Sequence, residues 1–193
     1  MLQADADIIV NSQWGLDFVS FVRQAKQFGL FDEAVFMNFD TAGDYEVLAS
    51  LGPDLPDGLV LSGRSHVNWP PSRLNREFTN EFFNRAGRYP SSAANSAYAA
   101  ILAIADAISA SDGVTHKDHI RAELRNLKLK LPEDPEGFMS FMDPQTHQLM
   151  QVQAIGVIGP DNSYPPSAKL LSDWTLFYPK GFKQSDRGSA SFD

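Results

Sequence analysis

The chain has 193 residues, of which 43% are hydrophobic and 21% are charged. These proportions are typical of globular domains and argue against disorder and against a membrane-embedded fold. The formal net charge of -8 would repel a phosphate backbone, and the absence of cysteine excludes disulfides, thiolate nucleophiles and cysteine-based metal sites.

The N-terminal third begins with a predicted strand-helix unit. Residues 1–7 have neither the basic nor the apolar stretch of a signal peptide, so we expect none in this chain. A β-branched run from Ile8 predicts a strand that reaches Trp14. From Leu16 onward the apolar residues follow helical spacing until Gly29.

The same strand-helix pattern then repeats. Val35 opens a second predicted strand that ends at Asp40, a short helix follows around Tyr45 to Leu51, and residues 59–62 form a third strand. This alternation predicts right-handed parallel crossovers and an α/β fold. Three parallel strands are few for a sheet, so we expect part of this lobe to be missing from the chain.

The middle of the chain changes character. The irregular, proline-containing segment 64–71 predicts a crossover or hinge. Helical spacing then predicts helices over residues 72–86, 92–110 and 115–127, the last opened by a capping box of Thr115 and Asp118. The most apolar run, residues 97–108, contains Asp106 and is shorter than the roughly 18 residues that span a bilayer, so we interpret it as a core helix.

The last third returns to strand patterns. Segments 137–142 and 149–158 predict a β-hairpin around Asp143 and Pro144, and residues 174–178 predict a final strand before a polar, flexible tail. Before the hairpin, three acidic residues lie between prolines in a stretch that we interpret as a solvated loop. These acidic residues are Glu133, Asp134 and Glu136.

Two residues stand where an α/β fold usually binds ligands. Parallel sheets bind small molecules at the carboxyl ends of their strands, where Trp14 and Asp40 fall. A carboxylate beside an aromatic ring suits an ammonium group on an apolar body. The alternative is that Trp14 is a core aromatic and Asp40 a helix N-cap.

Three further residues are weaker candidates for the same cleft. Gln13 and Thr41 adjoin the two main candidates. His66 lies in the predicted crossover, where it either borders a cleft or is an ordinary surface or hinge residue.

Catalytic, metal and cofactor motifs are missing. The sequence has no nucleophile elbow, no phosphate-binding glycine loop and no His-Glu-x-x-His motif. His116 and His119 have no third ligand in the pattern and are interpreted as helix surface, and His147 as a hairpin-loop residue. We therefore expect a small-molecule binder without cofactor or metal, and an enzyme such as a small α/β hydrolase only as a remote alternative.

Several stretches together resemble a known family. They are ADADIIVNSQW from Ala4, FVxFVxQAKxxGL from Phe18, GLVLS from Gly58, GRYP from Gly87, YAAILA from Tyr98 and KLPEDPEG from Lys130. From about Ala4 to Trp174 the chain resembles the C-terminal portion of type I periplasmic binding proteins, specifically the branched-chain amino-acid (leucine, isoleucine, valine) substrate-binding components of ABC transporters.

The resemblance implies a periplasmic-binding-protein-like type I fold with two doubly wound lobes joined by a hinge, its N-terminal part absent from this chain. It implies part of lobe two in residues 1–63 and the C-terminal part of lobe one in residues 64–145. Residues 146–178 would hold the hinge return strand and the end of lobe two, and residues 179–193 a flexible tail.

The resemblance also implies a function. In amino-acid-binding members, an aromatic and an acidic residue of lobe two hold the ligand, and these positions fall on Trp14 and Asp40. A further aromatic contact falls near Ala93 and is lost, which opens the pocket to amides and aromatic acids. The groups that grip the ligand carboxylate belong to the part of lobe one that is missing, so this chain alone is expected to bind weakly.

The implied partner is an ABC permease and the implied location of the full-length protein is the periplasm. The same fold also serves in ligand-sensing receptors and regulators for amides and amino acids, which is the alternative function.

Overall fold

The computed structural model describes residues 6–111, 113 and 115–180, which divide into two compact units. The first unit comprises Met1–Asn68 and Gln153–Leu176, and the second comprises Trp69–Val152 and Phe177–Asp193. The chain thus passes between the units three times. The first passage, after Asn68, falls within the irregular segment 64–71.

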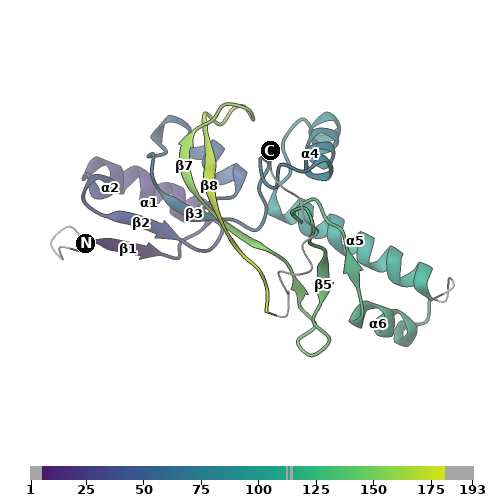
Figure 1. Cartoon of the computed structure of the whole chain (residues 1–193). Coiled ribbons are helices and arrows are strands. Elements are labelled where there is room, and N and C mark those ends of the chain that lie inside the picture. The colour runs from purple at the N-terminus through teal and green to yellow at the C-terminus, as the bar shows by residue number, and fades with distance from the viewer. Residues whose placement is uncertain (1–5, 112, 114, 181–193) are drawn as a thin grey trace. The chain divides into compact units, whose positions relative to one another are not determined.

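A five-stranded sheet forms the centre of the first unit (Figure 1). Its order is β1 (Ile8–Asn11), β2 (Val35–Asn38), β3 (Val60–Ser62), β7 (Gln153–Pro160) and β8 (Lys169–Phe177). The parallel pairing of β1, β2 and β3 confirms the predicted crossovers. The sheet does not stop at three strands, however, because β7 joins β3 in antiparallel fashion and β8 follows it.

Helices cover one face of this sheet. They are α1 (Gly15–Gln27), α2 (Leu30–Glu33) and α3 (Tyr45–Leu51), followed by the short 3-10 turn η2 (Gly52–Asp54). Successive right-handed crossovers in the same direction place α1 and α3 on the same side, where they pack together. Phe36 of β2 is buried beneath them, with its ring 5.6 Å from that of Phe21 and 6.1 Å from that of Phe18.

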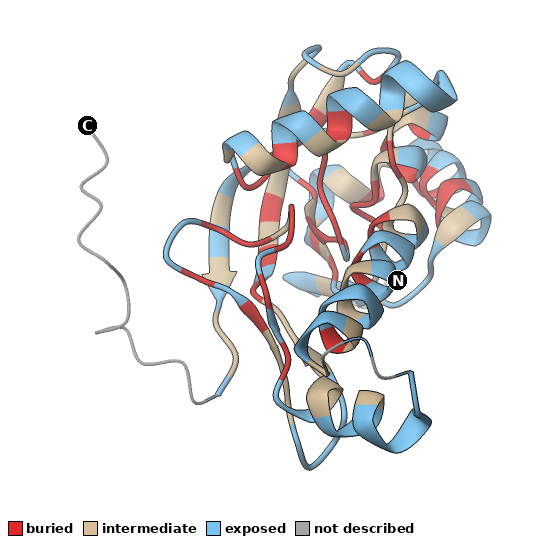
Figure 2. Ribbon diagram, turned by 90° about the vertical axis from the view of Figure 1, so that its right-hand side faces the viewer, coloured by how far each residue is buried: buried red, intermediate tan, exposed pale blue. Residues whose placement is uncertain are grey.

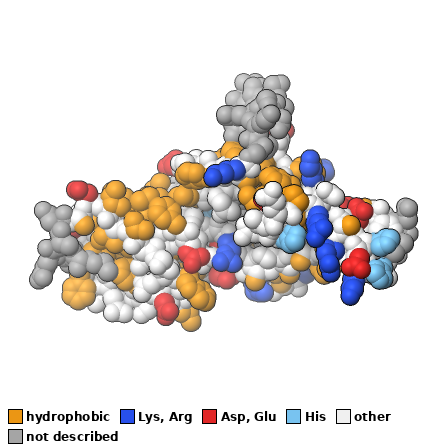
Figure 3. All heavy atoms as spheres, turned by 90° about the horizontal axis from the view of Figure 1, so that it is seen from below, with side chains coloured by type: hydrophobic (Ala, Val, Ile, Leu, Met, Phe, Trp, Pro, Cys, Tyr) orange, Lys and Arg blue, Asp and Glu red, His pale blue; other side chains and the backbone are white. Residues whose placement is uncertain are grey.

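The opposite face of β1 and β2 is exposed. Ile8 pairs with Val35 in the parallel register, so their side chains lie on the same side as that of Val10. All three are more than half exposed. Seen from below the view of Figure 1, hydrophobic side chains gather on the surface near the N-terminus (Figure 3).

The first strand is shorter than predicted. It ends at Asn11 instead of reaching Trp14, because the Asn11 side-chain oxygen accepts a hydrogen bond of 2.8 Å from the backbone N–H of Gln13. This local bond turns the chain out of the ladder. Trp14 consequently stands at the N-cap position of α1.

The second unit combines three helices with a small sheet. The helices are α4 (Arg73–Ala86), α5 (Ser92–Ala110) and α6 (Lys117–Arg125), and the antiparallel sheet contains β4 (Lys128–Leu129), β5 (Ser140–Met142) and β6 (Leu149–Met150). Buried Ala99 packs with Leu127, Leu129 and Leu131 in its core. Figure 2 marks the buried residues of both units in red.

The predicted hairpin is present, but the predicted extent of its second strand is wrong. β5 pairs with β6 around the Asp143 turn, yet the predicted continuous strand 149–158 is two strands that belong to two different sheets. The alternating pattern continues through the break at residues 151–152, so it does not reveal the change of sheet. The predicted strand 174–178 corresponds to the end of β8, which begins earlier, at Lys169.

Helix α5 corrects two expectations. The run 97–108 is by itself too short to span a membrane, but the complete helix has 19 residues. By length and composition alone it is long and apolar enough to cross a membrane. Core helices pass the same test, so this finding alone assigns no span. It is a core helix on one face only, because Ala99 is buried in the core of the unit whereas Tyr98, Ile101 and Ile104 are exposed.

The start of α6 differs from the predicted capping box. The helix begins at Lys117, and its N-cap is His116, whose Nδ1 accepts a hydrogen bond of 3.4 Å from the backbone N–H of Asp118. Thr115 therefore does not cap it. Of the two chain ends, residues 1–5 and most of the predicted tail, from 181 onward, lie outside the described residues.

The prediction of a solvated acidic loop is wrong for its central residue, Asp134. Asp134 is fully buried and its carboxylate accepts hydrogen bonds from the backbone N–H groups of Leu131 and Ser140, both 2.9 Å, and from the Ser140 hydroxyl at 2.6 Å. Lys130 Nζ donates to three nearby backbone carbonyls, those of Asp134, Pro135 and Phe138. The acidic residues are thus part of a folded turn.

Candidate functional site

Three neighbouring strand ends define the candidate site in the first unit. Asn11 pairs with Asn38, and Asn38 pairs with Leu61, so the carboxyl ends of β1, β2 and β3 lie along the same edge of the sheet. The loops that follow these ends carry Trp14, Asp40 and Arg64 respectively. This edge is where open parallel sheets bind ligands.

A buried amide fixes the first two loops. Asn38 is fully buried, and its Nδ2 donates to the Asn11 side-chain oxygen at 2.9 Å and to the Gln13 carbonyl at 2.8 Å. Its Oδ1 accepts from the Asp40 backbone N–H at 3.0 Å. One side chain therefore holds the loop after β1 against the loop after β2. This role of Asn38 was not predicted from the sequence, although an asparagine at the end of an otherwise apolar strand was a visible signal.

The third loop is tied to the second. The Ser62 hydroxyl donates to the Asp40 carbonyl at 3.1 Å, and the Asp44 carboxylate accepts from the Arg64 backbone N–H at 3.1 Å. A Cβ atom at Gly63 would lie 2.6 Å from that carboxylate oxygen, so this close approach requires glycine. The backbone at all three strand ends is thus held by hydrogen bonds.

The side chains at these ends are open to solvent. Trp14 is 66% exposed, and the side chains of Asp40 and Arg64 are 41% and 72% exposed. Arg64 Nη2 lies 3.9 Å from Asp40 Oδ1, a loose ion pair. Trp14 is therefore not a core aromatic. Asp40 is not the N-cap of the following helix either, because Asp44 occupies that position.

Gln13 and Thr41 contribute mainly backbone to this region. The Gln13 side-chain oxygen accepts from Asn11 Nδ2 at 3.1 Å, and its carbonyl is the group bound by Asn38. Thr41 is half-buried, and its carbonyl accepts from the Asp44 N–H at 3.1 Å. Both residues shape the loops beside the exposed side chains.

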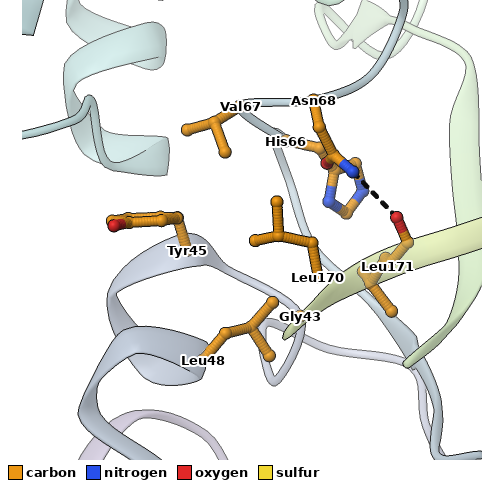
Figure 4. A pocket seen from close by; sticks show the side chains of 8 residues that line it. All are labelled: Gly43, Tyr45, Leu48, His66, Val67, Asn68, Leu170 and Leu171. Atoms are coloured by element: carbon orange, nitrogen blue, oxygen red, sulfur yellow. Dashed lines mark hydrogen bonds between the residues drawn. The ribbon is translucent and has the colours of Figure 1, made fainter. Parts of the chain in front are cut away.

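His66 is buried, contrary to the surface interpretation. It lines a small cavity of about 10 Å³ together with residues of α3, the loop after β3 and β8, which Figure 4 draws with the 2.8 Å bond from Asn68 Nδ2 to the Leu171 carbonyl. That volume accommodates about one water molecule and no amino acid. The His66 ring packs against Trp174, with the two ring centroids 4.7 Å apart. Burial lowers the pKa of His66 to about 4, and a hydrogen bond with the Ala154 backbone partly opposes this shift.

A larger hollow, of about 400 Å³, lies at the opposite ends of the strands. Asp7, Asp32 and Glu33 line it with Asp57, which is paired with Lys169 at 2.9 Å. These residues precede β1, β2 and β3, so the hollow is at the amino edge of the sheet, away from the usual ligand edge. A group of carboxylates on an open surface does not by itself define a site.

Metal ligands are not assembled in the part of the chain that the structure describes: no group of three or more histidine or acidic side chains is placed to hold an ion. His116 and His119 stand at the exposed start of α6, with ring centroids 6.0 Å apart. The site at the strand ends therefore offers an aromatic surface, a carboxylate and a guanidinium as its recognition groups.

The comparisons with known proteins identify the family. The chain belongs to the periplasmic binding protein family, whose sequence model matches residues 1–162. None of the curated proteins compared with the chain matches it.

Several solved structures share the fold. The chain is similar to a solute-binding protein of an ABC transporter from Rhodopseudomonas palustris BisB5 in complex with 3,4-dihydroxybenzoic acid, with 19% identity, a TM-score of 0.75 and coverage of 91% of this chain and 46% of that chain. It is similar to an amino-acid ABC transporter substrate-binding protein from Pseudomonas fluorescens Pf-5, with 17% identity, a TM-score of 0.74 and coverage of 93% and 47%.

A third structure is the leucine-, isoleucine-, valine-, threonine- and alanine-binding protein from Brucella ovis in its closed conformation, with 15% identity, a TM-score of 0.75 and coverage of 92% and 44%. The chain thus spans about half the length of the solved structures that it matches. Its fold is the type I periplasmic-binding-protein fold that the sequence resemblance implied.

Proposed function

We propose that the chain is the C-terminal portion of the solute-binding component of an ABC importer and that it contributes Trp14 and Asp40 to the solute site. One observation carries the proposal. Both side chains are exposed at the carboxyl ends of adjacent parallel strands, while hydrogen bonds hold the backbone beneath them.

The chemistry of these two residues favours an amino-acid-like solute. The Asp40 carboxylate accepts no hydrogen bond from the described part of the chain, so its oxygens are available to a ligand ammonium group. The exposed Trp14 indole offers an apolar surface and a cation-π face for the rest of the molecule. Neither group assembles a nucleophile or a general base, which supports binding without catalysis.

The solved structures of this fold support a solute with an apolar body. One of them is in complex with 3,4-dihydroxybenzoic acid, and another is a leucine-, isoleucine-, valine-, threonine- and alanine-binding protein. For this chain we propose branched-chain or related amino acids first, and amides or aromatic acids as the alternative class. An ABC permease would be the partner and the periplasm the location of the full-length protein.

Calorimetric titration with leucine tests the ammonium role of Asp40. We expect binding heat from the wild-type chain, loss of that heat in Asp40→Asn, and unchanged heat in the control Asp54→Asn. Asp54 is a comparable exposed carboxylate of the same unit, 3.3 Å from Arg23. Heat that persists unchanged in Asp40→Asn would contradict the pairing.

A second titration separates the ligand classes. The same variants are titrated with 4-hydroxybenzoate, which lacks an ammonium group. Binding of the benzoate but not of leucine would replace the amino-acid class by the aromatic-acid class. Because the chain alone is expected to bind weakly, both titrations use high ligand concentrations. A folded chain that gives heat with neither compound under these conditions would contradict the proposed contribution of Trp14 and Asp40 to the solute site.

A further inference from the structure

We infer that Arg64 is a specificity-determining residue of the strand-end site, and that it favours ligands with a carboxylate, in addition to the lobe-one groups that the family resemblance implies. Without ligand, Arg64 pairs with Asp40. With ligand, Asp40 exchanges Arg64 for the ligand ammonium, and the released guanidinium binds the ligand carboxylate. The inference rests on the proposed function and extends it to a residue that the sequence analysis did not select.

The two charges are anchored close together. Asp40 and Arg64 each lie two residues beyond the end of their strand, and β2 and β3 are paired neighbours. The Arg64 N–H is bound to the Asp44 carboxylate and the Asp40 carbonyl to the Ser62 hydroxyl. The charged side chains therefore start from fixed backbone positions, although their ends are exposed.

Arg64 has bonding capacity to spare. A guanidinium carries five N–H donors in a fork that matches both oxygens of a carboxylate. Within residues 6–111, 113 and 115–180, Asp40 is the one acidic group in ion-pair range of the Arg64 guanidinium, at a loose 3.9 Å. The Arg64 side chain makes no hydrogen bond to these described residues. Arg23 differs, because its guanidinium also donates to the Ser50 carbonyl at 2.8 Å.

Charge balance then decides which ligands fit. A simple amine that binds Asp40 places two cations around one carboxylate, and a simple acid that binds Arg64 places two carboxylates around one guanidinium. A zwitterion gives each charge an opposite neighbour. Two unit charges about 4 Å apart interact by about 1 kcal/mol in water, so we expect about fivefold discrimination at this exposed site.

Three ligands with the same phenyl body isolate this effect. They are L-phenylalanine, 2-phenylethylamine, which lacks the carboxylate, and 3-phenylpropanoate, which lacks the ammonium group. Each is titrated into the full 193-residue chain, and the indole N–H signal of Trp14 is followed by NMR and assigned with Trp14→Phe. The wild type is expected to prefer phenylalanine over the amine by about fivefold.

The variant Arg64→Gln is expected to remove this preference, by weakening phenylalanine and strengthening the amine. Asp40→Asn is expected to have the reciprocal effect and to favour 3-phenylpropanoate. The control Arg73→Gln removes an exposed arginine of α4 that pairs with Glu77 at 3.4 Å, and this variant is expected to behave as wild type. Thermal unfolding verifies that each variant is folded.

Equal changes for phenylalanine and the amine in Arg64→Gln, or no change for either, would overturn the inference while leaving the proposed function standing. If the wild-type Trp14 signal responds to none of the three ligands, the proposed function fails at this site and the role of Arg64 fails with it.

Discussion

Asp40 in the first unit and Asp134 in the second are both carboxylates in turns, but their surroundings are opposite. Asp134 is fully buried and accepts three hydrogen bonds from Leu131 and Ser140. Asp40 is partly exposed and has one loose ionic partner, Arg64, in the described part of the chain. The backbone around both is fixed, and what differs is whether the charged oxygens are already used.

This difference separates folding from recognition. A carboxylate whose oxygens are all bound inside the chain stabilises its turn and has nothing left to offer a ligand. A carboxylate held at its backbone but open at its oxygens costs the fold little and is available for binding. We therefore expect substitutions of buried polar groups to act on stability, and substitutions of Asp40 to act on binding.

The largest effect is expected from Asp134→Ala. It leaves three donors without their acceptor in a buried turn, so we expect the free energy of unfolding to fall by about 3 kcal/mol or more in urea titrations. Asp106→Ala, an exposed position on α5, is the control and should change it by less than about 0.5 kcal/mol. A similarly small loss of unfolding free energy in both variants would contradict the proposed structural role of the buried Asp134 carboxylate.

Asn38→Leu is expected to combine the two kinds of effect. It removes three hydrogen bonds from the strand ends and leaves the Gln13 carbonyl and the Asp40 N–H without this partner, so stability should fall by about 2 kcal/mol. Because the loops carrying Trp14 and Asp40 lose their common anchor, ligand affinity of the folded fraction should fall as well. A stability loss with unchanged affinity would reduce Asn38 to a purely structural residue.

His66 is expected to make stability depend on pH. Its pKa is about 4 in the folded chain and about 6.5 when unfolded, so the unfolded state takes up the proton first as the pH falls. Its contribution is complete above about pH 6.5 and is lost as the pH falls toward 4. Between pH 7.5 and pH 5 the loss attributable to His66 is about 2 kcal/mol.

The His66 prediction is measured as the pH dependence of urea unfolding in the wild type minus that in His66→Gln. His147→Gln, in the exposed hairpin loop, serves as the control and should retain the wild-type dependence. Identical pH profiles for the wild type and His66→Gln would contradict the lowered pKa.

The smallest effect on stability is expected from Asp40→Asn. Its loose, exposed ion pair contributes less than about 0.5 kcal/mol, so the unfolding midpoint should stay close to that of wild type and of Asp54→Asn. A large destabilisation would assign Asp40 to the fold and would end its comparison with Asp134.

The sequence predicted the parallel strands well because their evidence is local. The β-branched run at Ile8, the apolar run at Val35 and the helical spacing between them are enough to define the crossovers and hence the ligand edge. The position of Trp14 and Asp40 in the loops after β1 and β2 follows from the same reasoning, although β1 ends at Asn11 and not at Trp14. Their role in binding stays a prediction.

Other features depend on contacts between distant segments, which periodicity does not contain. The burial of Asp134 depends on Ser140 six residues later, and the joining of β7 to β3 depends on a strand nearly one hundred residues away. Arg64 was overlooked as a recognition residue because its proximity to Asp40 arises only when β2 and β3 pair.

The central claim is that the strand-end loops of the first unit contact the solute. Backbone and indole N–H signals of the isotope-labelled wild-type chain, recorded during titration with L-phenylalanine, test it most directly. We predict that the concentration-dependent shifts concentrate at the Trp14 indole and at the amides of Asp40 and Arg64. Shifts confined to other parts of the chain, or no shifts in a folded sample, would contradict the claim.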